Sequence, residues 1–93
     1  MTKKEFLKLY EELKNKYEGQ EERALDFDNL IQSTFNTNYS MFDSNYDLYN
    51  ANFSYYIELE DEEDVWLVVD YNITGEGSNS LDSDIRINEI YVV

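Results

Sequence analysis

The run from Tyr55 to Tyr71, YYIELEDEEDVWLVVDY, constrains the fold most, because two β-rich segments flank an unbroken acidic block. Apolar side chains occupy alternate positions in both segments, which is the pattern of a half-buried strand. These residues are Tyr55, Ile57, Leu59, Val65, Leu67, Val69 and Tyr71. The pattern predicts a β-hairpin whose turn is formed by Glu58 to Asp64.

Six carboxylates lie within seven residues at the predicted hairpin tip, namely Glu58, Glu60, Asp61, Glu62, Glu63 and Asp64. Like charges at this density repel one another, so the tip is either a solubilising feature or a contact surface for a basic partner. Tyr56, Trp66 and Val68 point away from the apolar face, so they are either covered by a second layer or form an exposed patch. We predict that the six acids, with Tyr56, Trp66 and Asp70, bind a partner.

A first helix is predicted from Thr2 to Tyr17. Thr2 and Glu5 form a capping box, and Gly19 is placed to end the helix in a left-handed conformation. One apolar stripe follows the helical repeat and consists of Phe6, Leu9, Tyr10, Leu13 and Tyr17. Such a stripe indicates a helix that covers a core.

A second helix is predicted from Glu21 to Phe35. Its apolar stripe contains Ala24, Phe27, Ile31 and Phe35, with Leu30 beside it. We expect Asp26 and Asp28 to face solvent on the other side of this helix.

The rest of the chain predicts more strands. The polar segment from Asn36 to Asp47 contains aromatic residues, which indicate a short edge strand, a loop pinned to the core or an exposed recognition surface, and of these we expect the pinned loop. The first hairpin strand extends from Leu48 to Glu60, and a glycine-bearing loop covers Thr74 to Ser80. A last strand from Asp84 to Val93 changes phase, which predicts a bulge near Asn88. The predicted fold is therefore α+β, a single domain over residues 1–93 with two N-terminal helices packed on an antiparallel sheet of three or four strands.

The net charge of −14 is unevenly distributed. Residues 1–23 contain as many acids as bases, whereas the remaining residues contain fifteen acids and only Arg86 as a base. Such a surface repels nucleic acid and anionic membranes and attracts basic proteins. The charged N-terminus and the absence of cysteine and of a long apolar run predict a soluble, cytoplasmic protein.

The composition does not favour catalysis. Histidine and cysteine are absent, so the commonest general base and the thiol nucleophile are missing. The paired carboxylates lie at a hairpin tip, where water and mutual repulsion dominate, instead of in a cleft. We therefore expect neither an enzyme nor a cofactor or a specific metal site, although loose divalent-cation binding at Glu58 to Asp64 stays open.

With these features the chain resembles the small, cysteine-free, acidic α+β inhibitors of phages and mobile elements, including anti-CRISPR proteins and other DNA mimics. The resemblance rests on the helix-then-sheet order, the ELEDEED block and the scattered acids Asp70, Glu76, Asp82, Asp84 and Glu89. It implies an inhibitor that blocks the DNA-binding or PAM-reading groove of a CRISPR effector, or of another nucleic-acid enzyme.

Two alternatives stay open. One is an immunity or antitoxin protein that neutralises a basic nuclease toxin, and the other is a module whose charge serves only solubility. The lysine-bearing first helix departs from a fully anionic mimic, so contact with the partner through this helix is also open.

Overall fold

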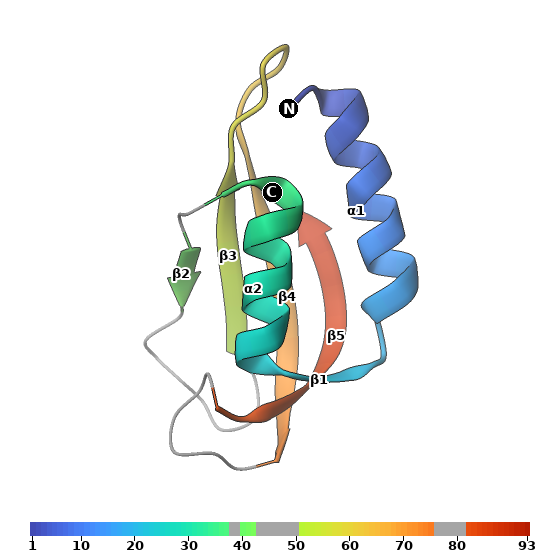
Figure 1. The fold of residues 1–93 in the computed structure, drawn as a ribbon, viewed down its shortest axis with the longest axis vertical. Coiled ribbons are helices and arrows are strands. Elements are labelled where there is room, and N and C mark those ends of the chain that lie inside the picture. The colour runs from blue at the N-terminus through green and yellow to red at the C-terminus, as the bar shows by residue number, and fades with distance from the viewer. Residues whose placement is uncertain (38–39, 43–50, 76–81) are drawn as a thin grey trace.

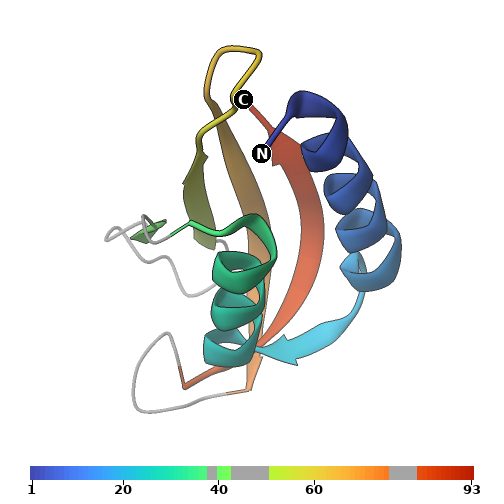
Figure 2. The same ribbon diagram turned by 45° about the horizontal axis from the view of Figure 1, so that its top comes forward.

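A computed structural model describes residues 1–37, 40–42, 51–75 and 82–93. The elements are α1 (Lys3–Tyr17), β1 (Glu21–Arg23), α2 (Ala24–Phe35), β2 (Ser40–Phe42), β3 (Ala51–Ile57), β4 (Val65–Gly75) and β5 (Asp84–Val92). The strands form one antiparallel sheet in the order β1-β5-β4-β3-β2. Both helices lie on the same face of this sheet (Figures 1 and 2). The predicted α+β class is confirmed.

Within the described residues the sheet has five strands where three or four were predicted, because a strand of three residues is added at each edge. Short strands at sheet edges limit the backbone that is open to pairing with other chains. One edge strand, β2, lies within the polar segment that follows α2, so residues 40–42 form an edge strand and not the expected loop. Strand β3 ends at Ile57 and not at Glu60 as predicted, and Thr74 and Gly75 belong to β4 and not to the predicted loop. The predicted start of β3 at residues 48–50, residues 43–47 of the polar segment and residues 76–80 of the predicted loop lie outside the described residues.

Helix α1 begins and ends as predicted. The backbone N–H of Glu5 donates to Thr2 Oγ1 at 3.2 Å, so Thr2 acts as the N-cap. Gly19 has a φ of 83°, a left-handed conformation that favours glycine, and the helix ends just before it.

Residues 21–23 were predicted as the first turn of the second helix, and this prediction is wrong. They form β1, which pairs with β5 so that Glu22 lies opposite Ile85. Backbone hydrogen bonds on either side hold this connection to β5, from the Gly19 N–H to the Ile87 carbonyl at 2.7 Å and from the Ala24 N–H to the Ser83 carbonyl at 2.9 Å. Pairing with a strand distant in sequence therefore overrides the local helix propensity of these residues.

Strands β3 and β4 form the predicted hairpin, and the last residue pair before the tip is Ile57 with Val65. The predicted bulge in β5 is also confirmed. Asp70 lies opposite Glu89 and Tyr71 lies opposite Ile87, so Asn88 is the extra residue. The apolar residues on both sides of the bulge therefore face the helices.

The core lies between the helices and the sheet. Its buried members are Phe6, Leu13, Ala24, Phe27, Ile31, Phe35, Phe53, Tyr55, Ile57, Leu59, Leu67, Val69, Tyr71, Ile85, Ile87 and Ile90. They include the predicted stripe of α2 and the predicted apolar face of the hairpin except Val65, which is partly buried against the core. Burial of this apolar surface is the main force that holds α1 and α2 on the sheet.

Asp28 was predicted to face solvent, and this prediction is wrong, because its side chain is only 5% exposed. Position 28 is four residues after Ala24 and three before Ile31, so it belongs to the buried face of α2. Its carboxylate accepts hydrogen bonds from Tyr55 Oη at 2.7 Å and from Gln32 Nε2 at 2.9 Å. These bonds offset the loss of water around a buried charge.

Candidate functional site

Three of the acids at the hairpin tip contact the start of α1, which lies beside the tip (Figure 1). The Glu60 N–H donates to the Met1 carbonyl at 3.0 Å, and the Glu60 carboxylate lies 3.6 Å from the Met1 ammonium group. The Lys3 N–H donates to Asp61 Oδ1 at 2.9 Å, and Lys3 Nζ lies 4.0 Å from Glu62 Oε1. We call this contact between Met1, Lys3 and residues 60–62 the clasp.

The clasp explains how so many like charges can share one turn. The first N–H groups of a helix have no partner within the helix and carry a partial positive charge. Asp61 accepts one of these donors, while the ammonium groups of Met1 and Lys3 lie close to Glu60 and Glu62. The tip is therefore also a structural contact, a role that the sequence did not predict.

Asp64 forms hydrogen bonds within the hairpin, across the base of the tip. Its carboxylate accepts hydrogen bonds from the Tyr56 hydroxyl and, at 3.1 Å, from the Leu59 N–H. These two bonds, the first more than the second, lower the pKa of Asp64. In turn, the hydrogen bond to Asp64 raises the pKa of Tyr56. Glu58 and Glu63 are exposed, and neither forms an ion pair with another residue in the described part of the chain.

We predict that Asp61→Ala will lower the free energy of unfolding by about 0.5–1 kcal/mol, because it removes an acceptor at the start of α1. Glu63→Ala is the matched control, since it deletes a carboxylate from the same tip without touching the clasp, and it should have little effect. Urea denaturation followed by circular dichroism measures both. Equal losses in the two variants would show that the clasp does not stabilise the protein.

The opposite face of the sheet, which we call the outer face, carries a mixed aromatic and acidic surface. Tyr56 lies opposite Trp66, and their rings meet edge to face with centroids 5.3 Å apart. The next row along β4 places Val68 opposite Tyr91, and the row after that places Asp70 opposite Glu89. Tyr56, Trp66 and Tyr91 are partly exposed, whereas Val68 between them is buried. The register places the predicted residues Tyr56, Trp66 and Asp70 on this one face.

Asp70 and Glu89 form a pair of like charges on adjacent strands. Partial burial, followed by the charge of Glu89, raises the pKa of Asp70, while a hydrogen bond from Tyr91 opposes the shift. Burial and the same two carboxylates raise the pKa of Tyr91. Neither acid forms an ion pair with a described lysine or arginine. The remaining residues, 38–39, 43–50 and 76–81, include neither of these residue types.

The predicted site residues thus divide into three groups. Glu60, Asp61 and Glu62 belong to the clasp, Tyr56, Asp64, Trp66 and Asp70 lie on or border the outer face, and Glu58 and Glu63 are exposed and belong to neither. Glu89 and Tyr91 also lie on the outer face, although neither was predicted as a site residue. Their signal is the alternation with Ile90 and Val92 after the bulge, which points both side chains to the outer face.

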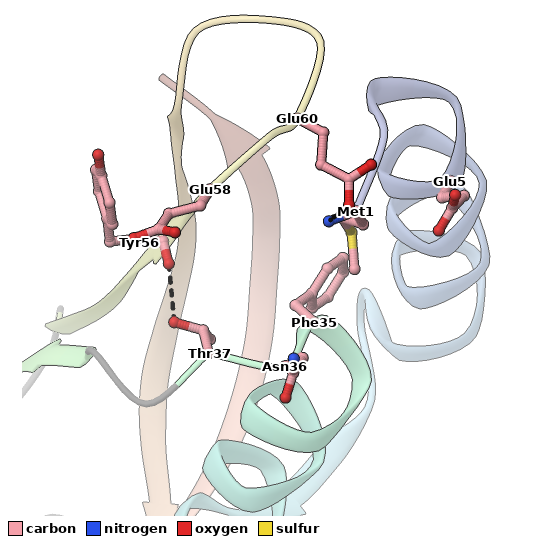
Figure 3. A pocket seen from close by; sticks show the side chains of 8 residues that line it. All are labelled: Met1, Glu5, Phe35, Asn36, Thr37, Tyr56, Glu58 and Glu60. Atoms are coloured by element: carbon pink, nitrogen blue, oxygen red, sulfur yellow. Dashed lines mark hydrogen bonds and ion pairs between the residues drawn. The ribbon is translucent and has the colours of Figure 1, made fainter.

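A cleft of about 710 Å³ opens between the start of α1, the end of α2 and the end of β3 (Figure 3). Glu5, Glu58 and Glu60 line it together with Met1 and Phe35. Among the residues that the structure describes, no three acidic side chains are arranged to hold a metal ion. The cleft is therefore an anionic opening beside the clasp.

Comparison with known proteins found no matching family model, no similar curated protein and no similar solved structure. Neither helix in the described ranges is long and apolar enough to cross a membrane.

Proposed function

We propose that this protein is an acidic inhibitor that binds the basic nucleic-acid-binding surface of a DNA- or RNA-acting protein in the cytoplasm of a host cell. The resemblance to anti-CRISPR proteins makes a CRISPR effector the favoured partner. The observation that supports the proposal is the segregation of charge. Residues 51–75 and 84–93, which contain β3, β4, β5 and the tip, carry nine acids and Arg86 alone, whereas α1 carries five lysines.

The chemistry of this surface suits a protein partner that normally binds phosphates. Carboxylates form charge-assisted hydrogen bonds with arginine and lysine side chains, which are the same side chains that bind the phosphate groups of nucleic acids. Segregated charge also orients the two proteins as they approach and accelerates their association. Aromatic side chains such as Trp66 and Tyr56 supply the desolvated contacts that carry much of the affinity in protein interfaces.

The clasp adds preorganisation. The Glu60 N–H and the Asp61 carboxylate are hydrogen-bonded to the backbone of Met1 and Lys3, so the tip is anchored at these two residues before a partner binds. A rigid charged surface loses less conformational entropy on binding than a flexible one does. In this proposal the protein inhibits by occupying a surface, and no catalytic step is involved.

Affinity capture from a lysate of the host cell, followed by mass spectrometry, tests the proposal. We expect a nucleic-acid-binding protein to be retained, to be released as salt is raised, and to be displaced by added DNA or RNA. The purified partner should then lose its nucleic acid when the protein is added. Retention of no nucleic-acid-binding protein, or retention that DNA and RNA leave unchanged, would overturn the proposal. Inhibition of a single toxin nuclease without any competition with its nucleic acid would identify an immunity protein instead.

A further inference from the structure

We propose that the outer face of β3, β4 and β5 binds an arginine-bearing polypeptide segment of the partner, with a guanidinium group held by Asp70 and Glu89 beside Tyr91. This inference rests on the proposed function and names its contact surface and the chemistry of the partner. It also shifts the main contact from the hairpin tip to the sheet.

The carboxylate pair of Asp70 and Glu89 supports binding of a cation. Like charges directly opposite each other on neighbouring strands are destabilising. Asp70 and Glu89 are such a pair, and neither forms an ion pair with a described lysine or arginine, although Arg86 lies opposite Asn72 in the next row of the same face. Tyr91 lies one row from this pair but brings no positive charge. A cation from outside the chain would therefore relieve a repulsion that the fold itself maintains.

The aromatic side chains beside the pair favour arginine over lysine. A guanidinium group is planar, can donate two parallel hydrogen bonds to carboxylates and stacks on aromatic faces. Tyr91 lies one row from the carboxylate pair, and the edge-to-face pair of Trp66 and Tyr56 lies one row further. A lysine ammonium group would be attracted by the carboxylates but would make less contact with the aromatic rings.

The spacing of the rows favours an extended segment. Side chains on one face of a strand repeat about every 6.6 Å, so the three rows from Asp70 to Trp66 span about 13 Å. A segment in extended conformation could therefore place an arginine on the acidic row and another side chain on Trp66. The carboxylates repel the phosphates of nucleic acids and of anionic lipids, so the surface fits a protein and not these ligands.

Binding of two fluorescein-labelled nine-residue peptides, polyarginine and polylysine, tests the inference by fluorescence anisotropy. Trp66 is the only tryptophan in the chain, so its own fluorescence reports whether a peptide occupies the outer face. We expect polyarginine to bind more tightly than polylysine and to change the emission of Trp66. The double variant Asp70→Asn, Glu89→Gln should weaken polyarginine binding about tenfold or more, since each lost charged hydrogen bond has an effect of this order.

The double variant Glu11→Gln, Glu12→Gln is the matched control. Both residues are exposed on α1, so it removes the same charge from the other side of the protein and should weaken binding by less than about twofold. Trp66→Leu, which keeps an apolar side chain, should reduce the preference for polyarginine. Equal losses in the two double variants, or equal binding of both peptides, would overturn the inference, because net charge alone would then explain the binding.

The peptide assay and the lysate capture can fail separately. Failure of the wild-type protein to bind polyarginine, together with capture of a nucleic-acid-binding protein, would overturn the outer-face inference and leave the proposed function standing. Selective peptide binding through Asp70 and Glu89, together with capture of no nucleic-acid-binding protein, would overturn the proposed function and leave an arginine-binding surface.

Discussion

Replacement of Phe6 by alanine is expected to lower the free energy of unfolding by about 3–4 kcal/mol, the range for loss of a buried phenylalanine ring. Phe6 is 2% exposed, and its ring lies 6.0 Å from that of Tyr10 and 5.5 Å from that of Phe35, measured between centroids. Phe6 and Leu13 are the two buried side chains of α1. The variant should therefore loosen the attachment of α1 to the rest of the core.

Leu7→Ala is the matched control for this prediction, because Leu7 is the next residue of the same helix and is 43% exposed. It should change stability by less than about 0.5 kcal/mol. Urea denaturation followed by circular dichroism gives both values, and hydrogen exchange shows whether the amides of α1 lose protection. If Phe6→Ala were as mild as Leu7→Ala, packing through Phe6 could not be what holds α1 on the sheet.

Replacement of Tyr55 by phenylalanine is expected to lower the free energy of unfolding by about 2 kcal/mol. The change removes a buried donor and leaves the Asp28 carboxylate with Gln32 as its hydrogen-bond partner. A buried acceptor that loses its donor retains the cost of its desolvation. Tyr56→Phe is the control, since it removes a hydroxyl that bonds to the exposed Asp64, and its effect should be much smaller.

A second comparison separates the bond from the buried charge. In the double variant Tyr55→Phe, Asp28→Leu both polar partners are replaced by apolar groups, so stability should recover in part relative to Tyr55→Phe alone. A double variant that is less stable than Tyr55→Phe would contradict this account, because it would mean that the carboxylate stabilises the core without Tyr55.

The same pair predicts a pH dependence. Burial, followed by the hydrogen bond to Asp28, raises the pKa of Tyr55 far above its ordinary value of 10. Above pH 10 the unfolded chain loses this proton while the folded protein keeps it, so stability falls as pH rises. The contribution of Tyr55 is about 1.4 kcal/mol per pH unit in that range. Urea midpoints between pH 8 and 11 should therefore fall less steeply in Tyr55→Phe than in the wild type, and equal slopes would contradict the prediction.

Local patterns in the sequence predict most of the fold. Alternating apolar residues identify β3 and β4, the helical stripe from Phe6 to Tyr17 identifies α1, and the change of phase in β5 identifies the bulge. These signals are local, because each depends on the repeat of a single element. The short strand β1 was not predicted, because it forms by pairing with β5, which lies more than 60 residues later in the sequence.

The candidate site was predicted less completely, for the same reason. The spacing of Asp28 places it on the buried face of α2, but its carboxyl group predicts an exposed position. Its burial depends on a hydrogen bond from Tyr55, which is 27 residues away in the sequence. The contact between Asp61 and the Lys3 N–H joins residues 58 apart. Charge composition identified the acidic tip, but only the register of β4 and β5 places Glu89 opposite Asp70.

The bulge at Asn88 has a consequence for how the length of the chain can vary. Ile87 and Ile90 both face the helices although they are three positions apart, because Asn88 is accommodated outside the regular pairing. If that one residue were lost, Ile87, Glu89, Ile90 and Tyr91 would follow each other in strict alternation and keep the faces they now occupy. The strand can therefore lose a residue at this point while its apolar side chains still face the helices and its polar side chains still face outward. Position 88 is thus a place where the length of the chain can change without disturbing the core.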